Sequence, residues 1–260
     1  MIILGLTGGI ACGKSVVSSA LKKQGIPVID CDVIAHDVVK KGRWGYKRVI
    51  KIFGPKILLP NGEIDRAALG KLVFEDAVFR RSLNAATHLP IALTILSQLI
   101  RYWLTFHPIV VIDMPLLFET KSNRWVHRVI SVVANEDLQV QRIMSRDGLD
   151  ESAARSRVAA QMPTAKKADL SDAVLENNGS KEALGEKVGN LVAQLKEHHV
   201  RVGGRAQKKN GNGPFIKKPS KLNQILTSPV VVLPVVFGSI AVVAHCLVMP
   251  VIHIVDKLFK

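Results

Sequence analysis

The sequence predicts an α/β fold with a parallel sheet covered by helices on both faces, and two observations carry this prediction. Short apolar runs bounded by turn residues recur along the chain, which is typical of strands buried on both faces. They are residues 2–6, 28–29, 109–112, 129–134 and a weaker run at 173–175. Longer segments with helical spacing separate these runs, and such alternation is typical of a doubly wound sheet.

Helices are expected in the segments between the apolar runs. The clearest apolar helical patterns are at residues 16–21 and 89–104. Two polar, charged stretches at residues 147–157 and 180–197 also have helical patterning. We interpret the first as a surface lid and the second as a helix that closes the domain.

The character of the chain changes near residue 198, so we expect a folded domain at residues 1–197 followed by two further segments. Residues 198–228 contain seven Lys or Arg residues, no acid and several glycines, which predicts a flexible linker. Residues 229–260 include the uncharged apolar stretch 230–255. This stretch exceeds the about 20 residues that a membrane helix needs, so we expect a hydrophobic helix that acts as a tail anchor.

An alternative remains for this tail, because Pro234 and Pro250 interrupt it. It is a hairpin or helix of the soluble core, or a surface docking helix.

The apolar run at the start of the chain is too short for a secretory signal and leads straight into a glycine-rich loop. A tail anchor with basic flanks suits the mitochondrial outer membrane or the endoplasmic reticulum, with the folded domain facing the cytosol. Without insertion, a cytoplasmic protein is expected.

The formal net charge of +15 is unevenly distributed. Residues 198–260 carry nine Lys or Arg residues against one acid, and the remaining excess is ordinary for an enzyme with polyphosphate substrates. No basic helix suggests a surface that reads bases, so nucleic-acid binding is not expected. The scattered residues Cys12, Cys31 and Cys246 form neither a zinc motif nor a disulfide framework.

A phosphate-binding loop follows the first apolar run. The motif G-x-x-x-x-G-K-[ST] is matched by Gly8, Gly9, Ile10, Ala11, Cys12, Gly13, Lys14 and Ser15. Its glycines let backbone N–H groups point at phosphate oxygens, and the following helix adds its positive end. Lys14 can reach the β and γ phosphates, while the Ser15 hydroxyl can bind Mg²⁺. ATP or GTP binding follows, although hydrolase, switch and kinase functions all remain open.

Two carboxylates, Asp30 and Asp32, follow the second apolar run. At this spacing in an extended chain both side chains point to the same side, and ligands bind at the carboxyl ends of parallel strands. We expect Asp32 to orient an acceptor hydroxyl and to take its proton as the phosphoryl group arrives. Asp30 either shares this site or caps a helix that begins near Val33.

The third apolar run ends in Asp113, which gives it the form of a Walker B element. Asp113 is expected to hold Mg²⁺ through water or to brace Ser15. Pro115 and then Leu116, Leu117 and Phe118 follow it. These apolar side chains either line a pocket for an organic acceptor or pack beneath the edge of the sheet.

Arg142 and Arg146 share one face of a predicted helix in an arginine-rich segment. Phosphoryl transfer spreads negative charge over the equatorial oxygens, and guanidinium groups on a mobile segment can stabilise it. We therefore expect both arginines to be lid ligands.

Several separated motifs together resemble the dephospho-coenzyme A kinase family over residues 1–195. They lie at residues 5–15, 30–32, 53–54, 62–66, 83–84 with 88, 113–119, 141–142 with 146–147, 160–161 and 177–180. With its hydrophobic carboxyl-terminal segment, the chain is most similar to the animal-type members with a single kinase domain. Departures include Cys12 where serine is common, His88-Leu89-Pro90 in place of a contiguous His-Pro, and Ser171-Asp172 in place of Ala-Asp.

The resemblance implies a three-layer P-loop NTPase fold with a helical substrate-binding insertion at about residues 35–105 and a lid at about 142–162. It implies transfer of the ATP γ-phosphoryl group to the ribose 3′-hydroxyl of dephospho-CoA, with Mg²⁺. Asp32 would be the base, aided by Lys14 and Arg142, with Arg142 and Arg146 on nucleotide phosphates and Asn177 near the adenine. The resemblance also implies that His88 and the loop from Pro115 to Phe118 contact the acceptor.

Two alternatives stay open at this stage. One keeps ATP chemistry but changes the acceptor to another small hydroxyl compound or nucleotide. The other is a membrane-anchored protein that binds nucleotide or coenzyme A and turns over little.

Overall fold

The computed structural model describes residues 1–203. The predicted hydrophobic helix and membrane anchor at residues 229–260, and all but the beginning of the predicted linker, lie outside the described residues. The beginning of that linker is helical, because the helix α9 (Lys181–Gly203) continues into it.

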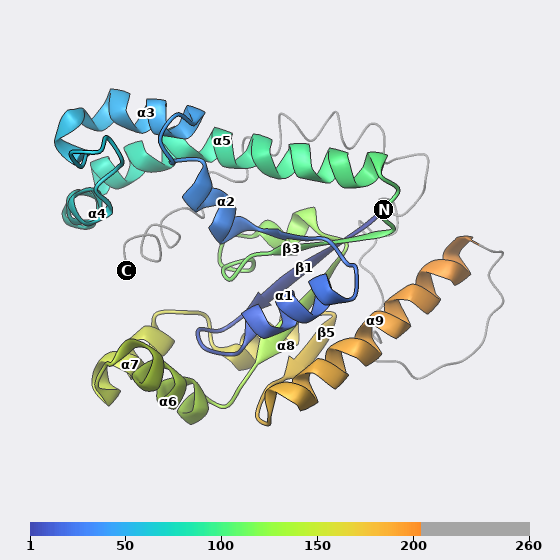
Figure 1. The fold of residues 1–260 in the computed structure, drawn as a ribbon. Coiled ribbons are helices and arrows are strands. Elements are labelled where there is room, and N and C mark those ends of the chain that lie inside the picture. The colour runs from blue at the N-terminus through green and yellow to red at the C-terminus, as the bar shows by residue number, and fades with distance from the viewer. Residues whose placement is uncertain (204–260) are drawn as a thin grey trace.

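A five-stranded parallel sheet forms the centre of the molecule, as predicted (Figure 1). Its strands are β1 (Ile2–Gly8), β2 (Val28–Asp30), β3 (Ile109–Asp113), β4 (Arg128–Val133) and β5 (Ala173–Glu176). The spatial order is β2-β3-β1-β4-β5, and every pairing is parallel. Because β1 is central, the glycine-rich loop that follows it opens in the middle of the sheet's carboxyl edge.

Helices cover both faces of this sheet. One face packs against α1 (Lys14–Lys23) and α9, and the other packs against α2 (Cys31–Asp37) and the long helix α5 (Ala77–Leu104) (Figure 1). Strand β3 serves both layers, since Ile109 and Val111 belong to the first apolar core while Val110 and Ile112 belong to the second. This division follows from the alternation of side chains along a strand, and it confirms the predicted three-layer α/β architecture.

The insertion between β2 and β3 is helical, as the resemblance implied. It contains the helices α2, α3 (Trp44–Phe53), η1 (Pro55–Ile57), α4 (Arg66–Glu75) and α5. A separate apolar core holds α3, α4 and the first part of α5 together through residues such as Val49, Leu69 and Leu83. The insertion is therefore a small unit with its own core.

Helix α5 begins 12 residues before the predicted segment 89–104, and it contains Pro90. The Asp76 side chain caps its start by accepting a hydrogen bond from the Val78 N–H. Within residues 1–203, α5 is also the one helix long and apolar enough to cross a bilayer. Half of its most apolar window is buried in the protein, as in core helices of soluble domains.

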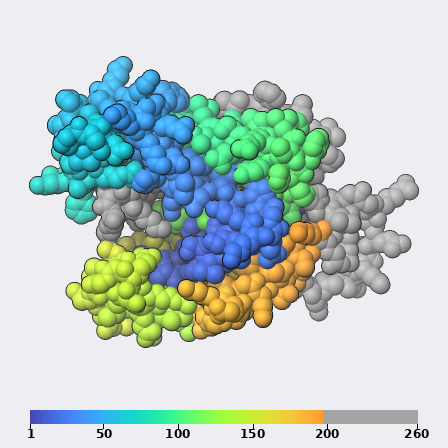
Figure 2. Space-filling view, in the orientation of Figure 1, coloured from blue at the N-terminus to red at the C-terminus, as the bar shows by residue number. Residues whose placement is uncertain are grey.

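A helical hairpin lies where the sequence predicts a lid, at about residues 142–162. It consists of α6 (Glu136–Asp147) and α7 (Glu151–Ala159), and α8 (Thr164–Leu170) follows. Gly148 adopts a left-handed conformation at the turn, and Asp150 caps α7 by accepting from the Ala153 N–H. Figure 2 shows the blue to cyan part of the insertion, with α3 and α4, and the yellow-green hairpin as two masses on the left of the view.

Candidate active site

The phosphate-binding loop connects β1 to α1 and has space only for glycine at two positions. A Cβ atom on Gly8 would lie 2.7 Å from the Val132 carbonyl oxygen. Gly13 has a φ of +89°, and a Cβ there would lie 2.2 Å from the Asn177 amide nitrogen. The loop is thus held close to β4 and to the loop after β5.

Lys14 and Asp113 form an ion pair at the base of this loop. The other Asp113 oxygen accepts a hydrogen bond of 2.8 Å from the Ser18 hydroxyl. Within the described residues, Asp113 thus contacts two other side chains of α1, and the bracing of Ser15 stays a prediction. Ser15 itself is exposed in the first turn of α1.

Asp113 is almost completely buried, with 1% exposure. Burial raises the pKa of this carboxyl group above its ordinary value, while the charge and hydrogen bonds of Lys14 and Ser18 act against that rise. Lys14 is consequently more than a mobile phosphate ligand in this state: it compensates a buried carboxylate at the end of β3.

The two carboxylates after β2 have different roles. Asp30 caps α2, since its side chain accepts hydrogen bonds from the Asp32 and Val33 N–H groups at 3.0 and 3.1 Å. The structure thus decides the open question about Asp30 in favour of the cap. The expected extended chain through Asp32 is wrong, because α2 begins at Cys31, two residues before the expected start near Val33. Asp32 is a partly buried residue of the first helical turn.

Arg142 and Asn177 converge on the phosphate-binding loop from two distant parts of the sequence. The Arg142 guanidinium donates to the Ala11 carbonyl at 3.2 Å and to the Asn177 carbonyl at 3.1 Å. The Asn177 amide donates to the Cys12 carbonyl at 2.9 Å. The structure therefore brings together two residues that the sequence placed at the nucleotide.

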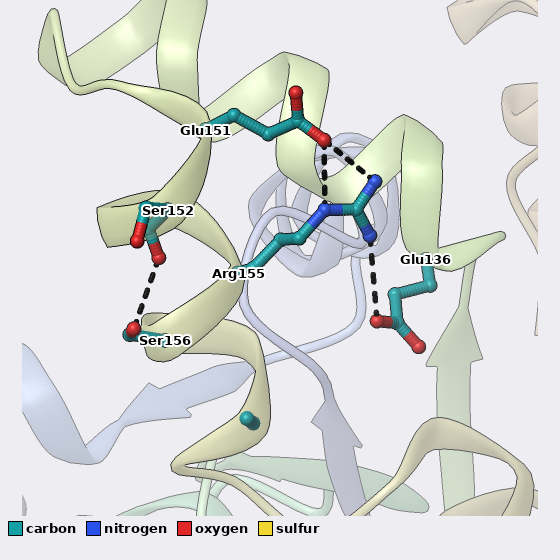
Figure 3. A pocket seen from close by; sticks show the side chains of 6 residues that line it. Glu136, Glu151, Ser152, Arg155 and Ser156 are labelled. Atoms are coloured by element: carbon teal, nitrogen blue, oxygen red, sulfur yellow. Dashed lines mark hydrogen bonds and ion pairs between the residues drawn. The ribbon is translucent and has the colours of Figure 1, made fainter.

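Arg146 is directed elsewhere in this structure. It forms a bidentate pair with Asp147, which also accepts from Arg157 at 2.6 Å. Another lid arginine, Arg155, lies on the outer surface between α6 and α7 (Figure 3). Its charge is compensated by nearby carboxylates, those of Glu136, Asp137 and Glu151. Among the described lid arginines, Arg142 is the one that contacts the phosphate-binding loop.

The apolar loop after β3 packs into the protein. Leu116, Leu117 and Phe118 are 8%, 1% and 8% exposed, and the last two belong to the core between the sheet and α2 and α5. Leu117 lies directly against Gly5 of β1. Of the two readings left open, packing beneath the sheet edge describes Leu117 and Phe118.

His88 lies on the buried face of α5, one turn after Asn84. Asn84 is 7% exposed, and its carboxamide oxygen accepts no hydrogen bond within the part of the chain that the structure describes. The predicted acceptor residue His88 thus lies in α5, which covers the same face of the sheet as α2.

Lys167 and Glu119 are two site-adjacent residues that the sequence analysis did not single out. Lys167 is completely buried, donates to the Pro115 carbonyl at 3.0 Å and pairs with the Glu119 carboxylate at 2.8 Å. The Thr7 hydroxyl donates to the same Pro115 carbonyl at 2.8 Å. Two lysines in a row, Lys166 and Lys167, are typical of a solvated surface. The sequence therefore carries no sign that Lys167 is buried.

Residues 161 and 162, which follow the hairpin of α6 and α7, form hydrogen bonds to two loops of the site. The Gln161 carboxamide accepts a hydrogen bond of 2.9 Å from the Ile10 N–H of the phosphate-binding loop. The next residue, Met162, donates its N–H to Glu119 at 3.3 Å. These bonds tie the end of the lid to the phosphate-binding loop and to the loop after β3.

Comparisons with known proteins agree with this geometry. The family model for dephospho-CoA kinase matches residues 2–183. The chain is 44% identical over 196 residues to an Arabidopsis thaliana protein called dephospho-CoA kinase, covering 75% of this chain and 84% of the relative. It is 41% identical over 196 residues to a dephospho-CoA kinase domain-containing protein of Danio rerio, covering 75% and 86%.

Solved structures give the same result. The dephospho-CoA kinase from Campylobacter jejuni superposes with a TM-score of 0.59 at 26% identity, covering 75% of this chain and 98% of that one. A Thermus thermophilus crystal structure superposes with a TM-score of 0.63 at 34% identity, covering 75% and 97%. With its family-model match, its relatives and its parallel sheet all in agreement, this chain belongs to the dephospho-CoA kinase family.

Proposed function

We propose that the chain transfers the γ-phosphoryl group of ATP to the ribose 3′-hydroxyl of dephospho-CoA and so forms coenzyme A. One observation carries this assignment to the site: Lys14, Asp113 and Arg142 meet at the phosphate-binding loop, beside the helix that carries Asp32. Membership of the family supports both substrates.

The reaction needs charge compensation on the donor side and a proton acceptor on the other. Backbone N–H groups of the loop, Lys14 and Arg142 are proposed to bind the ATP phosphates and to stabilise the charge that develops during transfer. The acceptor's 3′-oxygen forms a bond to the γ-phosphorus as the bond to the leaving oxygen of ADP breaks. The hydroxyl proton passes to the Asp32 carboxylate.

Mg²⁺ is the ion that we propose for this site. The Ser15 hydroxyl and the Asp113 carboxylate are oxygen donors of the kind that Mg²⁺ prefers, and both flank the loop that takes the phosphates. Such an ion would neutralise phosphate charge. Because Lys14 occupies one Asp113 oxygen in this structure, we expect that oxygen to become accessible when Lys14 turns to the phosphates.

The remaining residue roles are proposals of the same kind. Asn177 is proposed to lie near the adenine of ATP, since its amide already contacts the loop at Cys12. Arg146 would join the phosphates by exchanging Asp147 for them. His88 and the backbone around Pro115 are proposed to face the acceptor, while Leu116, Leu117 and Phe118 shape its side of the site from within the core.

The reaction is tested by measuring ADP release from the full chain with ATP, Mg²⁺ and one acceptor at a time. Dephospho-CoA, adenosine, shikimate and gluconate serve as acceptors, and the product is identified by mass spectrometry. We expect turnover that depends on dephospho-CoA and yields coenzyme A. Tight ATP binding without turnover on dephospho-CoA would instead indicate another acceptor or a binding protein with little turnover.

We also propose that the tail attaches the enzyme to a membrane, with the kinase facing the cytosol. The support is the uncharged stretch at residues 230–255 and the lysines on both sides of it. The mitochondrial outer membrane and the endoplasmic reticulum both suit such a tail. We expect the full chain to float with liposomes and a chain lacking residues 230–260 to stay in the soluble fraction; a full chain that remains soluble without detergent would exclude the anchor.

A further inference from the structure

We propose that Arg66 and His36 bind the diphosphate group of the acceptor. This inference rests on the proposed function, because it concerns the same acceptor site. It assigns a ligand class, an organic diphosphate, to two residues that lie outside the phosphate-binding loop and outside the motifs that place ATP.

The two residues meet between two helices of the insertion, α2, which packs against the sheet, and α4. His36 lies near the end of α2, and Arg66 is the first residue of α4. An Arg66 terminal nitrogen lies 3.2 Å from His36 Nδ1. A guanidinium group can only donate, so the imidazole must accept at Nδ1 and carry its proton on Nε2. That N–H is then directed away from Arg66 and is a second donor at the same place.

Arg66 is unusual among the arginines of residues 1–203 because its side-chain partner is an imidazole. Within residues 1–203, no carboxylate lies within ion-pair distance of its guanidinium. The nearby acids are engaged elsewhere: Asp37 pairs with Lys40 at 2.6 Å, and Glu63 accepts from the Asn61 amide at 3.3 Å. A guanidinium with several remaining donors suits phosphate oxygens, which it can bind in bidentate fashion.

The local charges support an anion at this position. Partial burial lowers the pKa of the Arg66 guanidinium below its ordinary value. Burial, followed by the charges of Arg66 and Lys40, lowers the pKa of the His36 imidazole. Burial is the largest cause of both pKa shifts, and the charge of Asp37 opposes both of them. A bound anion would add to that compensation of a partly desolvated pair.

The distance from Asp32 also fits the chemistry of the acceptor. Asp32 and His36 are four residues apart in α2, so their side chains lie on the same face, one helical turn apart, at about 5–6 Å between Cβ atoms. In dephospho-CoA, the 3′-hydroxyl and the diphosphate are separated by the neighbouring ring carbons C3′ and C4′, the C5′ carbon and its oxygen. Asp32 at the hydroxyl therefore places the diphosphate near His36 and Arg66.

The test compares two acceptor-site ligands that differ by the diphosphate. Binding of dephospho-CoA and of adenosine to the full chain is measured by calorimetry, with a saturating non-hydrolysable ATP analogue in the nucleotide site. We expect Arg66→Gln to weaken dephospho-CoA binding by about 10-fold to 100-fold, the loss of a charge-assisted contact. Adenosine binding should stay within about 2-fold. Arg66→Lys should recover part of the loss, and His36→Gln should cost less than Arg66→Gln.

Arg81→Gln is the matched control, because Arg81 is an exposed arginine of the same insertion, and thermal unfolding of every variant monitors the fold. An equal loss for both ligands, or unchanged dephospho-CoA binding, would overturn the inference. Wild-type turnover separates this from a failure of the proposed function. If the wild type phosphorylates dephospho-CoA while Arg66→Gln keeps the same KM, only the diphosphate site is wrong.

Discussion

The donor and acceptor sides of this site differ in how much of their structure is already made. On the donor side, Lys14, Asp113 and Ser18 bind one another, and Arg142 is held by two carbonyl groups. On the acceptor side, Asp32 is only partly buried, His36 is exposed, and Arg66 contacts a neutral ring. ATP must therefore replace existing bonds, whereas the acceptor meets side chains that are more open to solvent.

Removing the charge of Lys14 should break the donor side most severely. Lys14→Met is expected to reduce kcat/KM by about 10³-fold, because it removes a cation from the transferring phosphoryl group and leaves Asp113 buried without its ion pair. Steady-state ADP release measures the loss. Lys22→Met, in the last turn of the same helix, is the control; activity within about 10-fold of wild type in Lys14→Met would contradict the donor-side role.

On the acceptor side, Asp32→Asn should remove the proton acceptor without disturbing ATP. We expect kcat to fall by about 10²-fold to 10⁴-fold while the Kd for ATP stays unchanged. Rapid-quench kinetics and calorimetry measure the two quantities separately. Asp30→Asn is the matched control, since Asp30 caps α2 and an asparagine still caps a helix. Undiminished turnover in Asp32→Asn would remove Asp32 from the mechanism.

Lys167→Met should destabilise the loop after β3, which lies between the donor and acceptor sides. It leaves the Glu119 carboxylate and the Pro115 carbonyl without their buried partner, and breaking such a pair costs about 3–5 kcal/mol. Urea unfolding measures that cost. The double variant Lys167→Met with Glu119→Gln should recover part of the loss. Equal stability of Lys167→Met and wild type would show that the pair contributes nothing.

The smallest expected effect is a pH dependence that belongs to neither side. Burial lowers the pKa of the His127 imidazole below its ordinary value of 6.5, and its Nδ1 accepts a hydrogen bond of 3.0 Å from the Ile3 N–H. The unfolded chain therefore binds a proton near pH 6.5 before the folded chain does. The free energy of unfolding should fall as pH decreases below that value.

His127→Gln should flatten this slope between pH 7 and pH 5.5, as urea unfolding at both pH values would show. The free energy of unfolding of each protein at pH 7 serves as its own reference. An identical slope in both proteins would mean that His127 does not contribute to the acid sensitivity.

Much of this fold could be predicted from local pattern. The five apolar runs match the five strands to within two residues at each end, because runs buried on both faces have a distinctive composition. The start of α5 was missed because residues 77–88 combine charged residues with buried Leu83 and Ala86, which face the insertion's own core. These apolar positions pack against other helices, α3 and α4, so the segment itself has no clear apolar pattern.

The candidate site divides in the same way. The phosphate-binding loop and Asp113 lie in contiguous motifs, so their residue types revealed them. The cap at Asp30 was undecided until the start of α2 was known, because an i, i+2 pair has the same appearance before a helix as in a strand. Lys167 and Arg66 depend on contacts across 52 and 30 residues, and no local pattern announces a partner at that distance.

The order of the sheet has a consequence for a chain that is still being synthesised. Lys14 and Asp113 are 99 residues apart in sequence, and β1 cannot pair with β3 until the whole insertion has left the ribosome. The insertion has its own apolar core, so it can become compact while the first strand still waits for its neighbour. A nascent chain that ends before β3 should therefore have a folded insertion but no working nucleotide site.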